Sequence, residues 1–389
     1  MSTLSTTFLP FHRALIEEEE KKAVLEVLDS GWLTSGPRVR EFETAFAGYV
    51  GASHAVAVNS CTAALHLALA ALEITAGDEV IVPTMTFAAS GEVVLYRNAR
   101  PVLVDCLPGS FHMDPDKIAA AITPRTRAII PVHYAGYPCE MDSILEIARS
   151  HQLKIVEDAA HALPASYKGK MVGTIGDVTC FSFYATKTLT TGEGGMITTE
   201  NGELAERMRI LSLHGISSHA WNRYTAQGGW RYEILDAGYK YNLTDLQAAL
   251  GLAQLAKCDS MRNARARVAE EYSRLLMDQD AFTLASVPPG HQHAWHLYVV
   301  EVNPLALRIH RDQVMEELKE RGIGSSVHFI PLHLHPLYQK QLGYCTGQFP
   351  NAEDRFERAL SLPIYPDMTP DELGRVVEAL RDIARRFHV

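Results

Sequence analysis

Residues 156–199 decide the fold of this chain, and they read VEDAAHALPASYKGKMVGTIGDVTCFSFYATKTLTTGEGGMITT. The apolar run Lys154–Val156 predicts a buried strand that ends just before Asp158. A second apolar run, Thr179–Phe183, ends shortly before Lys187, and glycines follow. Ligands of open α/β sheets bind at the carboxyl ends of the strands. The stretch therefore predicts a ligand site that contains a carboxylate and an amine.

The pairing of Asp158 with Lys187 has a chemical reason. A lysine amine forms a Schiff base with an aldehyde cofactor, and the ring nitrogen of pyridoxal phosphate (PLP) then needs an acidic partner. That partner keeps the nitrogen protonated, so that the ring can accept electrons from a carbanion. The alternative is that Asp158 caps a helix and that Lys187 is a surface lysine. The longer pattern in which both residues occur favours the cofactor interpretation.

Three segments of this stretch, EDAAHA, FSFYATK and TTGEGG, resemble the sugar aminotransferases of the DegT/DnrJ/EryC1/StrS family. These are PLP enzymes of fold type I. The resemblance implies that Lys187 forms the Schiff base and that Asp158 meets the ring nitrogen. It also implies that His161 lies near the ring and its phenolic oxygen, and that Ser182 binds the phosphate. Tyr184 stands where many members have His, which makes it a candidate substrate contact.

A second branch of the family has His in place of the lysine and catalyses dehydration. Lys187 argues against that branch. Family members often have Tyr where Phe329 stands in this chain.

Length and composition limit the kind of protein. The chain has 389 residues, which is enough for one large domain and a smaller one, here expected at 1–259 and 260–389. Its net charge is −10, and no long basic run occurs, so nucleic acid is not an expected partner. The beginning of the sequence does not look like a signal peptide, and no apolar run reaches the ~20 residues of a membrane helix.

The six cysteines form no CxxC pair, and we expect reduced thiols in a cytoplasmic protein. They are Cys61, Cys106, Cys139, Cys180, Cys258 and Cys345.

Strand-like runs alternate with helical patterns along the first 213 residues. This alternation predicts βαβ units and a mostly parallel sheet. It agrees with the α/β fold class that the resemblance implies, in which helices flank a central sheet and a smaller C-terminal α/β domain follows. No GxGxxG follows the first strand, which argues against a dinucleotide site. The expected strands are 54–58, 79–82, 101–105, 128–132, 154–156, 179–183 and 196–199, and the expected helices are 17–28, 40–50, 59–72, one ending at Tyr96, 143–150 and 203–213.

The start of the helix over 59–72 is a candidate phosphate site, because helix N-termini present unpaired N–H groups. We expect Thr62 and the backbone of Ala63 to bind the cofactor phosphate, as the resemblance implies. The alternative is that Ser60 or Thr62 only caps the helix. Phe87 occupies the position of the family's aromatic residue that stacks on the pyridine ring, although it could also belong to the core. The loop 31–43 is expected on the substrate side.

Residues 214–238 read as a long loop, and loops of this length are usually functional or disordered. Arg231 and the aromatic residues of this loop are candidates for nucleotide contact, although ordinary surface residues explain them equally well. A long helix is expected from a capping box at Thr244 to about Leu276. The resemblance implies that Asn242 contacts the cofactor phosphate of a second subunit, so a homodimer is expected. The alternative is that Asn242 is a helix-start residue.

The C-terminal part is expected to contain strands at 296–302 and 325–329 and helices at 311–321 and 369–386. The segment VHFIPLHLHPLY contains His328, His333 and His335. A metal site is not the leading interpretation, because no Cys or carboxylate joins them and the spacing is not that of a helical HxxxH. The resemblance makes His328 a candidate substrate contact.

The predicted reaction moves the amino group of L-glutamate to the keto group, most simply at C4, of a nucleotide-linked keto sugar. HAWNRY (219–224), HAWHLY (293–298) and the YAGYP turn are most similar to members that act on UDP-sugars. Alternatives are dTDP- or GDP-linked 4-keto-6-deoxy sugars, 3-keto sugars and a cyclitol ketone. A different class of function is a regulator that kept the fold without turnover, and Asp158, His161 and Lys187 argue against it.

Overall fold

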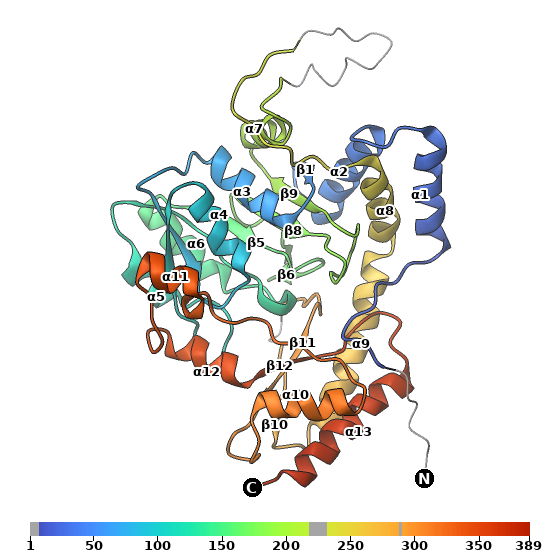
Figure 1. Cartoon of the computed structure of the whole chain (residues 1–389). Coiled ribbons are helices and arrows are strands. Elements are labelled where there is room, and N and C mark those ends of the chain that lie inside the picture. The colour runs from blue at the N-terminus through green and yellow to red at the C-terminus, as the bar shows by residue number, and fades with distance from the viewer. Residues whose placement is uncertain (1–7, 218–231, 288–289) are drawn as a thin grey trace.

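A computed structural model describes residues 8–217, 232–287 and 290–389, and it contains a seven-stranded central sheet (Figure 1). Strand β9 pairs antiparallel with both of its neighbours, and the other pairings are parallel, so the predicted α/β fold is confirmed. In sheet order, the strands are β1 (His54–Val58), β9 (Gly195–Thr199), β8 (Val178–Ser182), β5 (Lys154–Asp158), β4 (Thr126–Ile129), β2 (Glu79–Pro83) and β3 (Arg100–Val104).

Alternating side chains along each strand contact different helices on the two faces of the sheet. Val80 and Val82 of β2 pack in one core, with helices α3 (Cys61–Ala71), α4 (Ala88–Tyr96) and α7 (Gly202–Ser212). Ile81 lies in another core, with α5 (Pro115–Ala121) and α6 (Met141–His151). The sheet is therefore covered by helices on both sides, which leaves the strand ends as the place for a ligand.

The N-terminal helices pack beside the β1 edge of the sheet. Helices α1 (Glu18–Ser30) and α2 (Pro37–Val50) both contact α8 (Asp245–Ala256). The capping box predicted at Thr244 is present.

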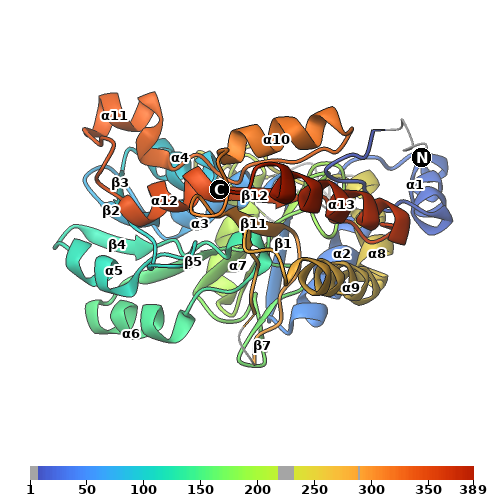
Figure 2. The ribbon, with the colours of Figure 1, turned by 90° about the horizontal axis from the view of Figure 1, so that it is seen from below.

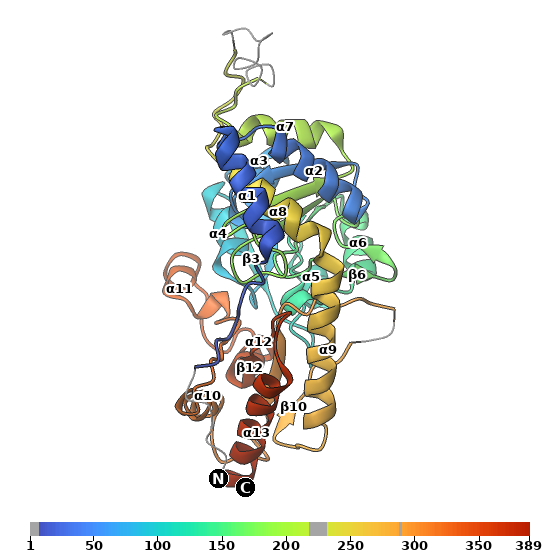
Figure 3. The same cartoon turned by 90° about the vertical axis from the view of Figure 1, so that its right-hand side faces the viewer.

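The prediction of one continuous helix from Thr244 to Leu276 is wrong. The chain leaves the helical conformation at Lys257, with φ −115° and ψ 14°, before α9 (Cys258–Leu276) begins. The Lys257 ammonium lies 2.7 Å from a carboxylate oxygen of Glu17 and of Glu20. This break lets α9 leave the large part of the molecule and run along the C-terminal part (Figure 3).

The C-terminal part has its own antiparallel sheet of β10 (Phe282–Thr283), β11 (Tyr298–Val302) and β12 (Ala359–Leu362). Helices α9, α10 (Arg311–Glu320) and α13 (Pro370–Arg386) share a separate apolar core with it, and Figure 2 shows them around β11 and β12. Leu9 lies in this core and pairs with Ile323. The domain boundary near residue 260 stays a prediction.

The strand predicted at 325–329 is wrong. Only one isolated bridge forms there, between Ser326 and Ser361, because the chain turns toward the large part instead of continuing along β12. Sequence analysis also missed some short elements: β6 (Ser166–Tyr167), β7 (Lys170–Met171), α11 (Pro336–Leu342), α12 (Pro350–Arg358), β12 and the 3-10 turns Tyr134–Gly136 and Leu332–Leu334. Within the described ranges, no helix is long and apolar enough to cross a membrane.

Candidate active site

Asp158 is the last residue of β5 and is almost completely buried, with 5% of its surface exposed. One carboxylate oxygen accepts a hydrogen bond from the hydroxyl of Ser90 at 2.7 Å, and the other accepts one from the backbone N–H of Ala160 at 3.1 Å. Burial raises the pKa of Asp158, while these two hydrogen bonds and the charge of Lys187 oppose the rise. The carboxylate is therefore oriented and close to an opposite charge.

Ser90 is a site residue that sequence analysis missed. It lies in the first turn of α4, and its hydroxyl also shares a 2.7 Å hydrogen bond with the hydroxyl of Thr86. Both side chains are buried. The only sequence signal is a pair of hydroxyl residues in the turn after β2, a pattern that capping explains equally well.

Lys187 follows β8, in the loop that returns to β9. Its backbone N–H donates to the carbonyl of Tyr184 at 2.9 Å. Burial lowers the pKa of Lys187 to about 8, against the opposing charges of Cys61 and Asp158. Among the described residues, its ammonium makes no hydrogen bond and no ion pair within 4 Å. Such an amine is partly neutral near neutral pH, and the neutral form is the nucleophile.

His161 lies three residues after Asp158 and is buried. Its Nδ1 accepts a hydrogen bond from the backbone N–H of Ala135 at 3.2 Å, which leaves the ring proton of the neutral form on Nε2. Burial, with the charges of Lys187 and His328, holds the pKa of His161 well below its usual range. The ring is therefore a neutral N–H donor at physiological pH.

The start of α3 and the end of β8 come together. Ser182 of β8 pairs with Gly195 of β9, and a Cβ added to Gly195 would lie 2.6 Å from the backbone carbon of Ser60. Only glycine permits this close approach, which brings Ser182 beside the first turn of α3.

Some polar groups at the first turn of α3 and at Ser182 already form hydrogen bonds within the protein. The Ser60 hydroxyl accepts the N–H of Ala63 at 3.1 Å, so capping by Ser60 is confirmed. Thr62 is half-buried, and the hydroxyl of Ser182 accepts the N–H of Tyr184 at 3.3 Å. A phosphate that took the Ala63 N–H would have to replace the Ser60 contact.

Aromatic rings lie beside this group. Phe87 has 59% of its surface exposed, so the alternative that it belongs to the core is wrong. Its ring centroid lies 5.5 Å from that of Phe329, which in turn lies 5.7 Å from the ring of His161. An exposed ring held this way presents a surface on which a flat ligand can stack.

Of the candidate substrate residues, His328 lies beside His161, with 6.4 Å between the ring centroids. Its Nδ1 shares a 2.9 Å hydrogen bond with the hydroxyl of Ser361, and burial with the charge of Lys187 lowers the pKa of His328 to about 4. Tyr184 is exposed. Arg231 lies outside the described residues.

The three histidines of the C-terminal segment have different partners. His328 contacts Ser361, His333 shares hydrogen bonds with Thr84 and Glu353, and His335 contacts the carbonyl of Ile330. In the part of the chain that the structure describes, no three His, Cys, Asp or Glu side chains gather as a metal site.

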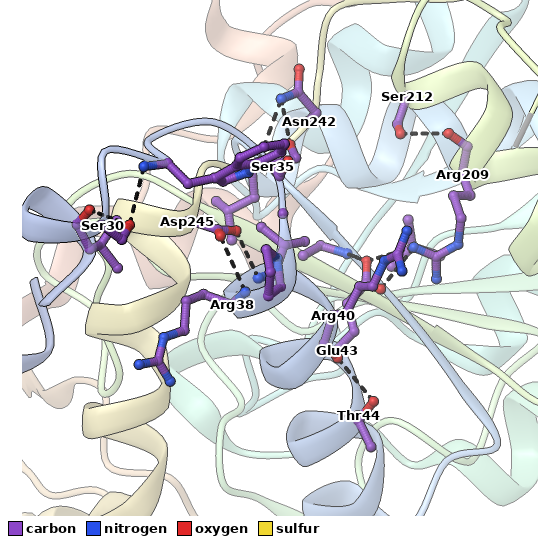
Figure 4. A pocket seen from close by; sticks show the side chains of 18 of the residues that line it. Ser30, Ser35, Arg38, Arg40, Glu43, Thr44, Arg209, Ser212, Asn242 and Asp245 are labelled. Atoms are coloured by element: carbon purple, nitrogen blue, oxygen red, sulfur yellow. Dashed lines mark hydrogen bonds and ion pairs between the residues drawn. The ribbon is translucent and has the colours of Figure 1, made fainter. Parts of the chain in front are cut away.

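Asn242 pairs with Val58 at the end of β1 and lines a cavity of about 980 Å³ that we call the Asn242 cavity (Figure 4). Its amide donates to the hydroxyl of Ser35 at 2.7 Å and accepts from Lys240. It precedes the helix cap Thr244 by two residues, so the alternative that it starts the helix is wrong. None of its hydrogen bonds reaches Asp158, His161 or Lys187. The cavity lies between α1, α2, β1 and α7, and its lining includes Trp32, Ser35, Arg38, Arg40, Glu43, Arg209, Ser212, Asn242 and Asp245.

The residues around Asp158 fit PLP. The lysine with a lowered pKa matches the aldehyde of PLP, and the buried, oriented carboxylate matches its ring nitrogen. The exposed aromatic ring matches its flat face. Ser182 and the first turn of α3 offer hydroxyl groups for a phosphate.

Comparisons with known proteins identify the family. The sequence model of the DegT/DnrJ/EryC1/StrS aminotransferase family matches residues 14–381. The spore coat polysaccharide biosynthesis protein SpsC of Bacillus subtilis is 50% identical over 97% of both chains.

Solved structures agree with this result. Spr1654 of Streptococcus pneumoniae, named as a sugar aminotransferase, superposes in its PLP form with a TM-score of 0.91 at 34% identity, over 97% of this chain and 99% of that one. Its PMP form matches equally well. DesV of S. venezuelae, solved with a ketimine intermediate, gives a TM-score of 0.89 at 39% identity, over 98% of this chain and 100% of its own. The chain therefore belongs to the DegT/DnrJ/EryC1/StrS aminotransferase family of PLP-dependent sugar aminotransferases.

Proposed function

We propose that this enzyme transfers the amino group of L-glutamate to the C4 keto group of a nucleotide-linked keto sugar, with UDP as the nucleotide. The observation that carries the proposal is the group formed by Asp158, His161 and Lys187, in which a buried carboxylate, a neutral imidazole and an amine of lowered pKa lie together. The name of SpsC, which refers to polysaccharide biosynthesis, supports a saccharide pathway.

When bound, PLP supplies an aldehyde that accepts an amine and a ring that withdraws electrons from the neighbouring carbon. Lys187 is the residue that holds this aldehyde in our proposal. After an amino donor displaced it, its Nζ would move the proton from Cα of L-glutamate to the aldehyde-derived carbon of the cofactor, which leaves pyridoxamine phosphate and 2-oxoglutarate after hydrolysis. In the second half of the reaction, Nζ would move a proton from that cofactor carbon to the sugar carbon that receives the amine.

Asp158 holds the proton on the ring nitrogen. Its hydrogen bonds from Ser90 and Ala160 fix both oxygens and leave lone pairs for the ring N–H. A protonated ring nitrogen is an opposite charge, which favours the ionised carboxylate against the effect of burial. His161 would donate from Nε2 to the phenolic oxygen of the cofactor.

The remaining contacts in our proposal follow the family resemblance. Thr62, the backbone of Ala63 and Ser182 bind the phosphate, and Phe87 stacks on the ring. Tyr184, His328 and Arg231 contact the substrates. The charge of Lys187 acts on His328, which supports its place beside this group.

A homodimer completes the site in this proposal, with Asn242 reaching the phosphate of the second subunit. Exposed apolar side chains support an interface near the Asn242 cavity. Leu25, Leu28 and Leu33 are exposed, and their sequence neighbours Glu26, Val27 and Trp32 line the cavity.

The test is the visible absorption spectrum of the purified protein before and after L-glutamate is added. We expect a band from bound PLP that falls as pyridoxamine phosphate forms. A panel of UDP-, dTDP- and GDP-linked 4-keto and 3-keto sugars is then added, and the UDP-linked 4-keto sugar should restore the band.

Three results would contradict parts of the proposal. A band that L-glutamate leaves unchanged excludes glutamate as the donor. Recovery with a 3-keto or a dTDP-linked sugar alone excludes the proposed acceptor. No band even with added PLP excludes the cofactor role of Lys187.

A further inference from the structure

His296 is a buried histidine whose position none of the roles above explains. It is 4% exposed, and within the described ranges its Nδ1 is buried without any hydrogen-bond partner. Its ring centroid lies 4.4 Å from that of His161, with 45° between the ring planes. The side chain therefore packs directly on a residue of the candidate site.

A backbone contact holds His296 in this place. The N–H of Ala294 donates to the carbonyl of Gly136 at 2.9 Å, and the N–H of Leu297 donates to the carbonyl of Ala135 at 3.2 Å. The N–H of Ala135 in turn donates to Nδ1 of His161. Ala135 therefore links the segment before β11, residues 294–297, to the ring of His161 through hydrogen bonds.

There is no room for a side chain at position 136 of this junction. Gly136 has φ +98°, and an added Cβ would lie 2.7 Å from the carbonyl oxygen of His161 and 2.9 Å from Cβ of Ala294. The 294–296 segment and the backbone of His161 therefore pack closely on the two sides of Gly136.

The surroundings of His296 keep it neutral. Burial holds the pKa of His296 well below its usual range, and the charges of Lys187, His161, Arg265 and His328 act in the same direction. A neutral imidazole has one donor and one acceptor nitrogen. An orphaned nitrogen in this site is unfavourable, because a buried polar atom without a partner loses its hydration and gains nothing in return.

We infer that His296 is a positioning residue for His161, and that its Nδ1 gains a hydrogen-bond partner only when ligands fill the site beside Lys187. The partner is a polar group of bound PLP, or a water molecule that PLP orders. This inference rests on the proposed function of the Asp158 group. It predicts that the histidine at position 296 destabilises the PLP-free protein and stabilises the PLP-bound protein.

The test compares three variants of the full-length protein with and without PLP. His296→Phe keeps the ring and removes the orphaned nitrogen. His296→Asn keeps a polar atom near the position of Nδ1, whereas His296→Gln keeps one near Nε2. His66→Phe is the matched control, because His66 also has a buried ring nitrogen without a partner among the described residues, and its ring packs on Tyr239 at 4.7 Å.

We expect the PLP-free His296→Phe protein to melt about 2 °C higher than the wild type. Its dissociation constant for PLP should rise about tenfold. His296→Asn should restore affinity to near the wild-type value, and His296→Gln should not. His66→Phe should bind PLP like the wild type.

Two outcomes would overturn the inference. One is an unchanged PLP dissociation constant in His296→Phe. The other is a lower melting temperature together with weaker binding in all three variants, which would show only a packing role. If the wild type itself does not bind PLP, the proposed function fails before His296 is tested.

Discussion

The Asp158 group (Ser90, Asp158, His161 and Lys187) and the Asn242 cavity both combine carboxylates with basic side chains, but they differ in how the charges are paired. In the cavity, the carboxylate of Glu43 forms an ion pair with Arg209 at 2.8 Å. Asp245 accepts hydrogen bonds from the backbone N–H groups of Arg38 and Val39 at 3.2 and 3.0 Å. Each of these carboxylates has structural partners.

In the Asp158 group, the charges are close without forming an ion pair. Asp158 takes its hydrogen bonds from neutral donors, and the Lys187 ammonium has none within the described ranges. Nζ is therefore available to react, whereas the cations of the cavity hold the fold together. The comparison teaches that the carboxylates of the Asn242 cavity are paired, whereas the groups around Asp158 are oriented but not yet paired, as the proposed chemistry needs.

Replacement of Lys187 should have the largest effect. We expect Lys187→Ala to lower amination at least about 10⁴-fold, because the variant has neither the attacking amine nor the proton carrier. Its melting temperature should not fall, since removing a buried amine removes a desolvation cost. Steady-state kinetics and thermal melts measure both. Lys154→Ala, which removes an exposed lysine paired with Asp177, is the control and should react like the wild type.

Replacement of Asp158 should have the next largest effect. Asp158→Asn keeps the shape but cannot hold a proton on the ring nitrogen, so we expect kcat to fall about 10³-fold. Ser90→Ala removes one hydrogen bond to the carboxylate and should cost about tenfold. If Ser90→Ala lost as much activity as Asp158→Asn, Ser90 would have to act directly on the reaction.

The pH dependence of cofactor association tests the lowered pKa of Lys187. Below pH 8 the amine is protonated and cannot attack, and above pH 8 it is neutral. The rate constant for PLP binding to the cofactor-free protein should therefore rise about 100-fold from pH 6 to pH 9, with its midpoint near pH 8. Stopped-flow absorbance measures it. A midpoint near 10.5 would show that burial leaves Lys187 unperturbed.

Substitution in the Asn242 cavity should have the smallest effect on the reaction. We expect Asn242→Ala to weaken PLP binding about tenfold, since it removes the phosphate contact that we propose from the second subunit. Arg209→Met, which leaves Glu43 buried without its partner, should lower thermal stability by about 3 kcal/mol and leave kcat unchanged. A loss of kcat in Arg209→Met comparable to that in Asp158→Asn would remove the distinction between the two regions.

Sequence analysis predicted the site residues that lie at or after strand ends. It missed the residues that reach the site only through tertiary contacts. Asp158 and Lys187 follow apolar runs, so their place at the edge of the sheet could be predicted. Ser90 meets Asp158 across 68 residues of chain, and His296 meets His161 across an even longer separation. Local sequence patterns do not predict contacts between residues so far apart in the chain.

Local patterns also failed where a single residue changed the path of the chain. The apolar face of the 244–276 helix continues past Lys257, so this pattern does not predict the break that the backbone angles at Lys257 show. The ion pairs of Lys257 with Glu17 and Glu20 are tertiary contacts that the pattern does not predict either. Residues 325–329 read SSVHF and include a β-branched and an aromatic residue, yet among the described residues this segment has no strand with which to pair beyond Ser326. Composition alone does not supply a partner strand.

The central claim is that Lys187, rather than another lysine, holds the cofactor. The direct test is to reduce the PLP-loaded protein with borohydride, digest it and locate the phosphopyridoxyl group by mass spectrometry. Our account predicts one modified peptide, which contains Lys187 within FSFYATK. Modification of another lysine, such as Lys240 beside the Asn242 cavity, would contradict it.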